Sequence, residues 1–156
     1  MTTADCGIAA IRTAETILLG ENGGVRSRAQ IIALLGEPAG TFEDGGKGML
    51  HMGPNLNDAF NPIGFEATQA SIRSHSDFES VVAQGNIMIV GGFLNGPHAV
   101  VVEPSGGGQV NVYNWGPTTG GGHAFVQSMS ADQASRIPIQ SHSGATGNVW
   151  VITPRF

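Results

Sequence analysis

The apolar residues of the first part of the chain follow a helical period. Between residues 6 and 19 they recur at steps of three and four, with Asp5 placed to cap the start and Gly20 placed to stop the end. These apolar residues are Ile8, Ile11, Ala14, Ile17 and Leu18. A second apolar run follows Ser27 and Gln30, whose spacing is that of a capping box, and ends before a glycine. The pattern therefore predicts two helices at the start of the chain.

The period shortens from Asn86 onward. Residues 37 to 65 are expected to form an irregular loop, followed by short helices around 66 to 74 and 77 to 83, the latter capped by Asp77. Short β-prone segments then follow, at residues 87 to 90, 98 to 103, 109 to 114, 123 to 126 and 149 to 153. Helices followed by sequential strands predict an α+β fold, with N-terminal helices packed on an antiparallel β-sheet, in a single domain spanning residues 1 to 156.

One hairpin is expected to place two polar residues on a common face. A turn at residues 104 to 108 separates two runs of alternating valines. If it closes symmetrically, it pairs Val102 with Val110, Val100 with Val112, and His98 with Asn114. The opposite face carries Glu103, Gln109 and Asn111, so the valine face is expected to be the core face. His98 and Asn114 would then lie across from each other at the open end of the hairpin, with Cβ atoms roughly 5 Å apart.

Charge and length restrict the classes of partner. The net charge is −5 with seven Lys and Arg, which argues against nucleic acid or an anionic membrane as partner. No apolar run approaches the length of a membrane-spanning helix, and no signal peptide is visible. With one cysteine the chain forms no internal disulfide, and a free thiol best suits a reducing cytosol.

That cysteine, Cys6, is a candidate nucleophile. In the first turn of the predicted helix, the unpaired amides and the positive end of the dipole favour a thiolate. Asn114 would accept a hydrogen bond from one ring nitrogen of His98, leaving the other to serve Cys6, the logic of a Cys-His-Asn triad. The alternative is structural: Cys6 as a small buried apolar residue, His98 as a solvated edge histidine and Asn114 as a turn residue.

Three segments resemble a known superfamily: residues 5 to 10 (DCGIAA), 98 to 102 (HAVVV) and 112 to 117 (VYNWGP). In this order they are similar to the papain-like cysteine peptidases, most of all the bacteriocin leader-peptidase branch. Bacterial papain-fold toxin and effector domains, including a class presumed to deamidate glutamine, are also similar.

The resemblance implies a cysteine peptidase that cleaves a protein substrate after small residues or a double glycine. It further implies a secreted or delivered toxin that acts in the target-cell cytoplasm and travels with a cognate immunity protein. A glutamine deamidase with the same Cys-His-Asn site is one alternative. A non-catalytic binding module that keeps the fold is another.

The chain departs from the branch in two respects. Leader peptidases and papain carry a Gln shortly before the nucleophile that helps to form the oxyanion hole, and residues 1 to 5 contain none. The Cys6 amide can supply one donor, and the second must come from elsewhere. The side-chain candidates, unranked, are Gln30, Gln84, Asn55 and Asn57. No transporter segments follow, so we do not expect an intact processing exporter.

The other polar residues are weaker candidates. His123, after a glycine run, is a rival base without an acidic or amide partner on a paired strand. His51, His75 and His142 are expected to be solvated in loops, and Trp115 either shields the His98–Asn114 pair from water or is a core aromatic. One cysteine and five scattered histidines provide no metal-ligand set, and no phosphate-binding loop is found, so no metal or cofactor is expected.

Overall fold

The computed structural model describes residues 6–20, 26–35, 56–93, 97–114, 125–139 and 149–155. A six-stranded antiparallel sheet runs through them in the order β1-β6-β2-β3-β4-β5. The strands are β1 (Phe65–Ala70), β2 (Met88–Phe93), β3 (Pro97–Gly106), β4 (Gln109–Asn114), β5 (Phe125–Ser130) and β6 (Val149–Pro154). The helices are α1 (Cys6–Leu19), α2 (Arg28–Leu35), α5 (Leu56–Phe60), α6 (His75–Ala83) and α7 (Ala131–Ala134), with a 3-10 turn η4 (Asn61–Ile63). The predicted α+β class, with N-terminal helices on an antiparallel sheet, is confirmed.

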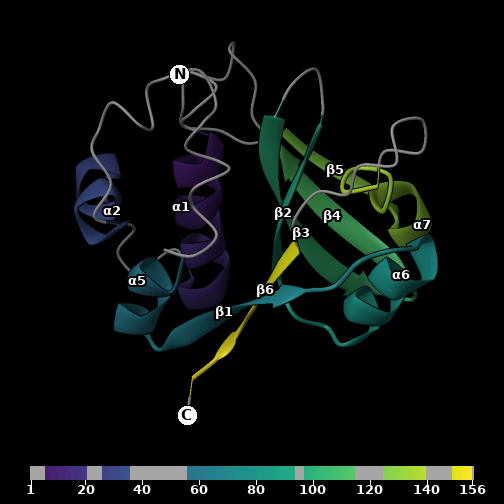
Figure 1. Ribbon diagram of the computed structural model, residues 1–156, viewed down its shortest axis with the longest axis horizontal. Coiled ribbons are helices and arrows are strands. Elements are labelled where there is room, and N and C mark those ends of the chain that lie inside the picture. Colours follow the sequence, from purple (N-terminus) through teal and green to yellow (C-terminus); the bar gives the residue numbers. More distant parts are fainter. Residues whose placement is uncertain are drawn as a thin grey trace.

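Helices cover both faces of the sheet (Figure 1). Helices α1, α2 and α5 lie on one side and α6 and α7 on the other, and each side has its own buried cluster. Along β3, Ala99 and Val101 face the α1 side, while Val100 and Val102 face the α6 side. The expectation that only the valine face would be core was therefore wrong, because strands covered on both sides need apolar residues at consecutive positions.

Helix α1 packs closely on β3 because several of its buried residues are alanines. Ala9, Ala10 and Ala14 are buried in the same cluster as Ala99 of β3. Short side chains on both sides let the helix backbone come near the strand. The predicted bounds of this helix are confirmed. Its last residue is Leu19, and the following residue, Gly20, has a φ of 79°, which suits a glycine.

Helix α2 begins with the predicted capping box. The Ser27 amide donates to Gln30 Oε1 at 2.7 Å, and the Gln30 amide donates to Ser27 Oγ at 3.2 Å. Just before it, Arg26 Nε donates to Glu15 Oε2 of α1 at 3.1 Å, and Glu15 is only 2% exposed. This buried ion pair ties the segment before α2 to the middle of α1.

Two predicted helices differ in the structure. Residues 65–70 form the edge strand β1, not a helix, and their exposure alternates along most of the strand. Helix α6 starts at His75. Its N-cap is Ser74, whose hydroxyl accepts from the Asp77 amide, and Asp77 Oδ2 accepts a hydrogen bond from the Arg73 amide, so Asp77 is not the cap itself. Within the predicted loop, residues 56–63 fold as α5 and η4, and residues 36–55 lie outside the described ranges.

The register of the β3–β4 hairpin is shifted by two residues from the expected one. Val102 pairs with Val112 and Val101 with Tyr113, and a bulge lies between Pro104 and Gly106. The strand continues to Gly106 and the chain reverses at Gly107 and Gly108, both of positive φ as in a type I′ turn. A shift of two keeps each residue on its face, so Val100, Val102, Val110 and Val112 still share one cluster. The fourth predicted strand is described from Phe125 and continues to Ser130, whereas residues 123 and 124 lie outside the described ranges.

Candidate active site

Cys6 is the first residue of α1. Its backbone amide is therefore one of the first amides of the helix, which have no carbonyl partner within the helix and form its positive end. The side chain of Cys6 and its expected cap, Asp5, lie outside what the structure describes. The backbone position is the one that the sequence predicts for a nucleophile activated by a helix N-terminus.

His98 is the second residue of β3, where it pairs with Gly92 of β2. A glycine has no side chain, so the neighbouring strand presents no Cβ at the position directly across from His98. Ala99, the next residue, pairs with a second glycine, Gly91. The side chain of His98 is outside the described part of the molecule.

Asn114 is the last residue of β4 and is half-buried. It pairs with Phe125 of β5 on one side. On the other side, continuing the observed register by one pair puts Val100 opposite Asn114, so the predicted direct pair of His98 with Asn114 is wrong. His98 lies two residues before Val100 on β3 and is therefore diagonal to Asn114, a position in which residues are roughly 7 to 8 Å apart and long side chains still meet.

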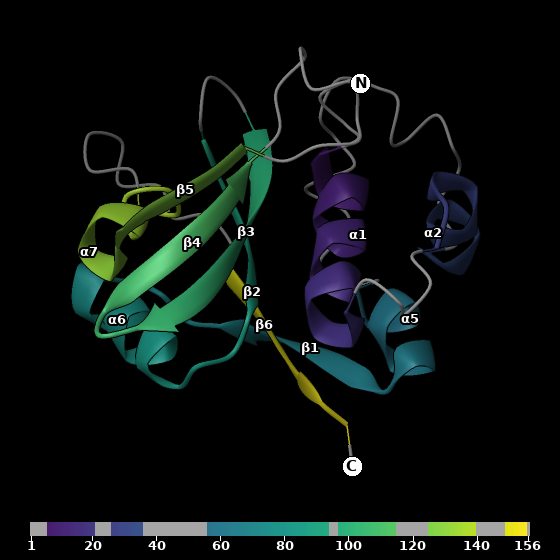
Figure 2. The same cartoon turned by 180° about the vertical axis from the view of Figure 1, so that it is seen from behind.

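The three backbones converge at one end of the molecule. Helix α1 begins, β3 begins and β4 ends at the same end, which is uppermost in Figures 1 and 2. Packing of α1 on β3 fixes this arrangement, because Ala10 and Ala14 of the helix share a buried cluster with Ala99 and Val101. The fold thus places the backbone positions of Cys6, His98 and Asn114 at the same end of the molecule.

A polar network lies on the α1 side of the hairpin. The Tyr113 hydroxyl donates to Glu103 Oε1 at 2.8 Å, and Asn111 Nδ2 donates to the same oxygen at 3.4 Å. Burial, followed by the hydrogen bond and the negative charge of Glu103, raises the pKa of Tyr113 to about 12. Tyr113 therefore stays a neutral donor beside Asn114. The sequence places these residues on one strand face, but their pairing depends on the register.

The four side-chain candidates for a second oxyanion donor have different positions and partners. Asn57 bonds the Ala67 backbone twice, accepting from its N–H at 2.7 Å and donating to its carbonyl at 3.2 Å, which commits this amide to the junction of α5 with β1. The side-chain oxygen of Gln30 is used in the α2 capping box. Gln84 is exposed at the C-terminal cap of α6, on the far side of the sheet from α1. Asn55 lies outside the described residues.

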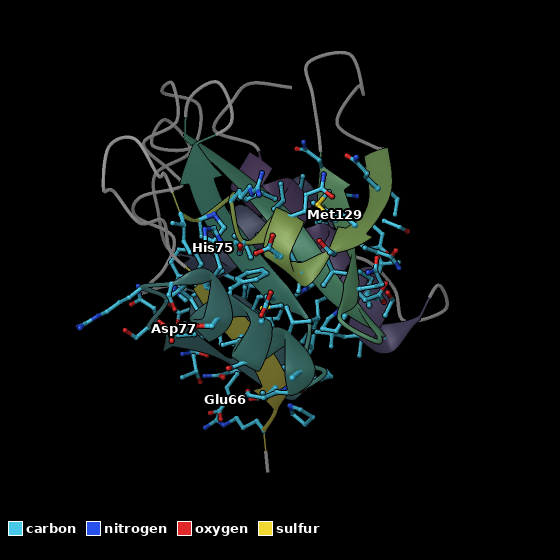
Figure 3. The ribbon with its side chains drawn as sticks, turned by 90° about the vertical axis from the view of Figure 1, so that its right-hand side faces the viewer. Glu66, His75, Asp77 and Met129 are labelled. Carbon is cyan, nitrogen blue, oxygen red and sulfur yellow. The ribbon has the colours of Figure 1, made fainter. Side chains whose placement is uncertain are left out.

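A serine–histidine contact elsewhere in the fold has a structural role. The Nδ1 atom of His75, at the start of α6, forms a hydrogen bond with Ser135 Oγ just beyond α7. Ser135 is fully buried, and its hydroxyl donates to the Asp132 carbonyl at 2.5 Å. The contact therefore joins the start of α6 to the turn after α7. His75 is exposed, but it belongs to a helix rather than to the expected loop (Figure 3).

The remaining sequence candidates are not placed. His51, His123, His142 and Trp115 all lie outside the described ranges. Within those ranges, His, Cys, Asp and Glu form no group of three or more that could hold a metal ion. The helices that the structure describes include none with the length and apolar character needed to cross a bilayer.

Comparison with known proteins gives a likeness in structure. No protein-family model matches the sequence, and no curated protein matches it. Among solved structures, the chain is similar to the peptidase domain of Streptococcus ComA, a bi-functional ABC transporter involved in a quorum-sensing pathway. The TM-score is 0.63 at 20% sequence identity, covering 99% of this chain and 95% of that domain. The likeness confirms the predicted papain-like fold, over nearly the full length of both chains.

Proposed function

We propose that this protein is a papain-like cysteine peptidase that hydrolyses peptide bonds in a protein substrate. The observation that carries the proposal is the fold, which matches a peptidase domain over 99% of the chain. Two further observations support it: Cys6 is the first residue of α1, and the strand ends that carry His98 and Asn114 lie at the same end of the molecule.

Each proposed residue has one chemical task. The Cys6 thiolate attacks the scissile carbonyl carbon, and the carbonyl electrons move onto oxygen to give a tetrahedral intermediate. Collapse of this intermediate breaks the C–N bond, and the imidazolium of His98 protonates the leaving amine. His98 then takes a proton from water, whose oxygen attacks the thioester carbon, and a second collapse releases the acid and restores the thiolate.

Asn114 orients the base, and a backbone amide stabilises the intermediate. An Asn side-chain oxygen that accepts from one imidazole nitrogen fixes the ring and leaves the other nitrogen for the thiol. The Cys6 amide at the start of α1 is the proposed first donor to the oxyanion. Loss of one such donor typically costs on the order of 100-fold in rate, so the second donor matters for the efficiency of the enzyme.

The substrate proposal follows the sequence motifs. By their likeness to leader peptidases, we expect cleavage after small residues or a double glycine in an extended peptide. The delivered-effector role, with action in the target-cell cytoplasm and a cognate immunity protein, rests on the motif resemblance alone and stays a prediction. Expression inside bacterial cells tests it, since growth should stop with the wild type and continue with Cys6→Ala.

Intact-mass spectrometry of candidate target proteins tests the reaction class. A peptidase converts a target into two fragments, whereas a deamidase leaves one slightly heavier species. Cys6→Ala and His98→Ala should abolish the reaction, and His75→Ala is the matched control because His75 lies on α6, outside the proposed site. Fragmentation by Cys6→Ala at the wild-type rate would refute the assignment.

Alkylation of the thiol separates a catalytic site from a binding module that only keeps the fold. Cys6 is the sole cysteine, so iodoacetamide uptake reports this residue alone. At pH 6 the folded protein should react about tenfold faster or more than the same chain unfolded in urea, because a helix N-terminus and a neighbouring imidazolium favour the thiolate. Equal rates would exclude an activated nucleophile.

A further inference from the structure

A pocket of about 320 Å³ opens at the end of β4, between that strand, β5 and α7. Asn114, the proposed orienting residue, lines this pocket. The other lining residues are Val112, Gln127, Met129, Gln133, Arg136 and Ile137. Figure 3 looks onto this side of the molecule and shows Met129 beside the segment that leads from β5 into α7. The volume is at the lower end of the range for ligand pockets, which suits a side chain or two of a bound peptide.

The lining combines an apolar floor with a polar rim. Val112 and Ile137 are buried, and Met129 is half-buried. Gln127 and Gln133 are exposed and provide amide donors. Among the described residues that line the pocket, Arg136 is the one that carries a charge. This combination suits a side chain that has an aliphatic stem and a hydrogen-bond-accepting, negatively charged end.

The Arg136 guanidinium is available to a ligand. Its Nη2 atom is 3.9 Å from Asp132 Oδ2, and the two side chains are 72% and 57% exposed. An exposed pair at that distance is weak, so Arg136 can exchange this partner for a better placed carboxylate. Asp132 itself lines a different pocket of about 620 Å³, together with Glu79 of α6 and the glycines of the β3–β4 turn. The two pockets thus have opposite charge.

We propose that the pocket at Asn114 is a specificity subsite that receives a glutamate side chain of the peptide substrate. The inference rests on the proposed peptidase function, because Asn114, the proposed orienting residue, joins the pocket to the proposed site. The apolar floor takes the two methylenes, the glutamines donate to the carboxylate, and Arg136 supplies the opposite charge. A lysine at the same substrate position would meet Arg136 as a like charge.

Cleavage of a peptide set tests this subsite. Each fluorogenic peptide has a central Gly-Gly in an alanine background, with Glu, Gln or Lys placed at one flanking position at a time. At one position the wild type should prefer Glu over Gln by about threefold to fivefold and over Lys by about tenfold, the size expected of an exposed ion pair. Arg136→Gln should remove the preference, and Arg136→Glu should reverse it in favour of Lys. The rate of each protein on each peptide is expressed relative to its own rate on the all-alanine reference peptide, so that only the preference among the side chains is compared.

Arg155→Glu is the matched control, because it makes the same change of charge at an exposed position on the β6 end and does not line the pocket. It should keep the wild-type preference. Equal cleavage of the Glu and Lys peptides at every position, or a Glu preference that survives Arg136→Glu, would overturn the subsite and leave the peptidase function standing. Failure to cleave any peptide of the set, combined with slow alkylation of Cys6, would overturn both.

Discussion

Tyr113 shows how one residue beside the proposed site is kept in a single protonation state. Its hydroxyl donates to Glu103, while its ring packs against the buried cluster that contains Ala99 and Val101. A phenolate here would lose solvation and face a carboxylate at hydrogen-bond distance. Tyr113 is therefore a fixed donor throughout the neutral range, and the end of β4 that carries Asn114 is held by a stable contact.

A spectroscopic titration checks this directly, because Tyr113 is the only tyrosine. Tyrosinate absorbance near 295 nm should rise with a midpoint at about pH 12, not at the ordinary value of 10.0. Glu103→Gln removes the charge and should move the midpoint towards the ordinary value. A midpoint near 10 in the folded wild type would show that the Tyr113–Glu103 contact is absent.

The same contact fixes the direction of one pH effect on stability. Between about pH 10 and 12 the folded state keeps the Tyr113 proton and the unfolded chain has lost it. Unfolding then releases a proton, so the free energy of unfolding falls as the pH rises through this window, and it is unaffected by Tyr113 below pH 10. In Tyr113→Phe this contribution should disappear.

At the level of the elements, the β3–β4 turn sets the geometry of the proposed site. Gly106, Gly107 and Gly108 have φ values of 97°, 63° and 75°, which L-residues with a Cβ rarely adopt. This run of glycines lets β3 continue to Gly106 and then reverse in two residues. The register that results puts His98 diagonal to Asn114 instead of opposite to it.

Substitutions at Gly107 test the turn. A Cβ at Gly107 meets no atom within 4 Å, so the cost is one of backbone conformation alone. Gly107→Ala should lower the free energy of unfolding by about 1 to 2 kcal/mol, as measured by urea denaturation. Gly107→Asn is the control and should cost less, because Asn tolerates the left-handed conformation. Equal stability of Gly107→Ala and the wild type would contradict the described turn.

Elements defined by local signals could be predicted from the sequence. The first helix, its stop at Gly20 and the Ser27–Gln30 capping box all depend on residues within one or two turns, and the structure confirms them. Strand β1 could not be predicted in the same way. Its partner β6 comes much later in the chain, since Phe65 pairs with Pro154. Pairing over such a distance leaves no signal in the neighbouring residues beyond a short alternation of exposed positions.

The candidate site divides along the same line. The motifs around Cys6, His98 and Asn114 are short, and each can be recognised in the sequence by itself. Their order along the chain led to the papain-like fold that the structural likeness confirms. The direct pairing of His98 with Asn114 was wrong, because it assumed a symmetric turn and the bulge before Gly106 is not visible in the residue pattern. The pocket at Arg136 depends on α7 packing against β4, which the sequence does not indicate.

For the whole molecule, the arrangement of layers explains why separate segments meet. One buried cluster fixes α1 against the sheet, and a second fixes α6 and α7 on the other face. With both faces held, the start of α1, the start of β3 and the end of β4 lie at the same end of the molecule, as Figure 2 shows. In the proposed account, Cys6 of α1 attacks the substrate, and the pocket at Arg136, near α7, binds a substrate side chain.

The central claim is that Cys6 cleaves peptide bonds in a protein target. Proteome-wide mapping of new N-termini, in cells that express the wild type or Cys6→Ala at equal levels, tests it most directly. We predict a set of N-termini that follow small residues or a double glycine and appear only with the wild type. Identical N-termini in the two samples, obtained with folded protein in both, would contradict the peptidase assignment.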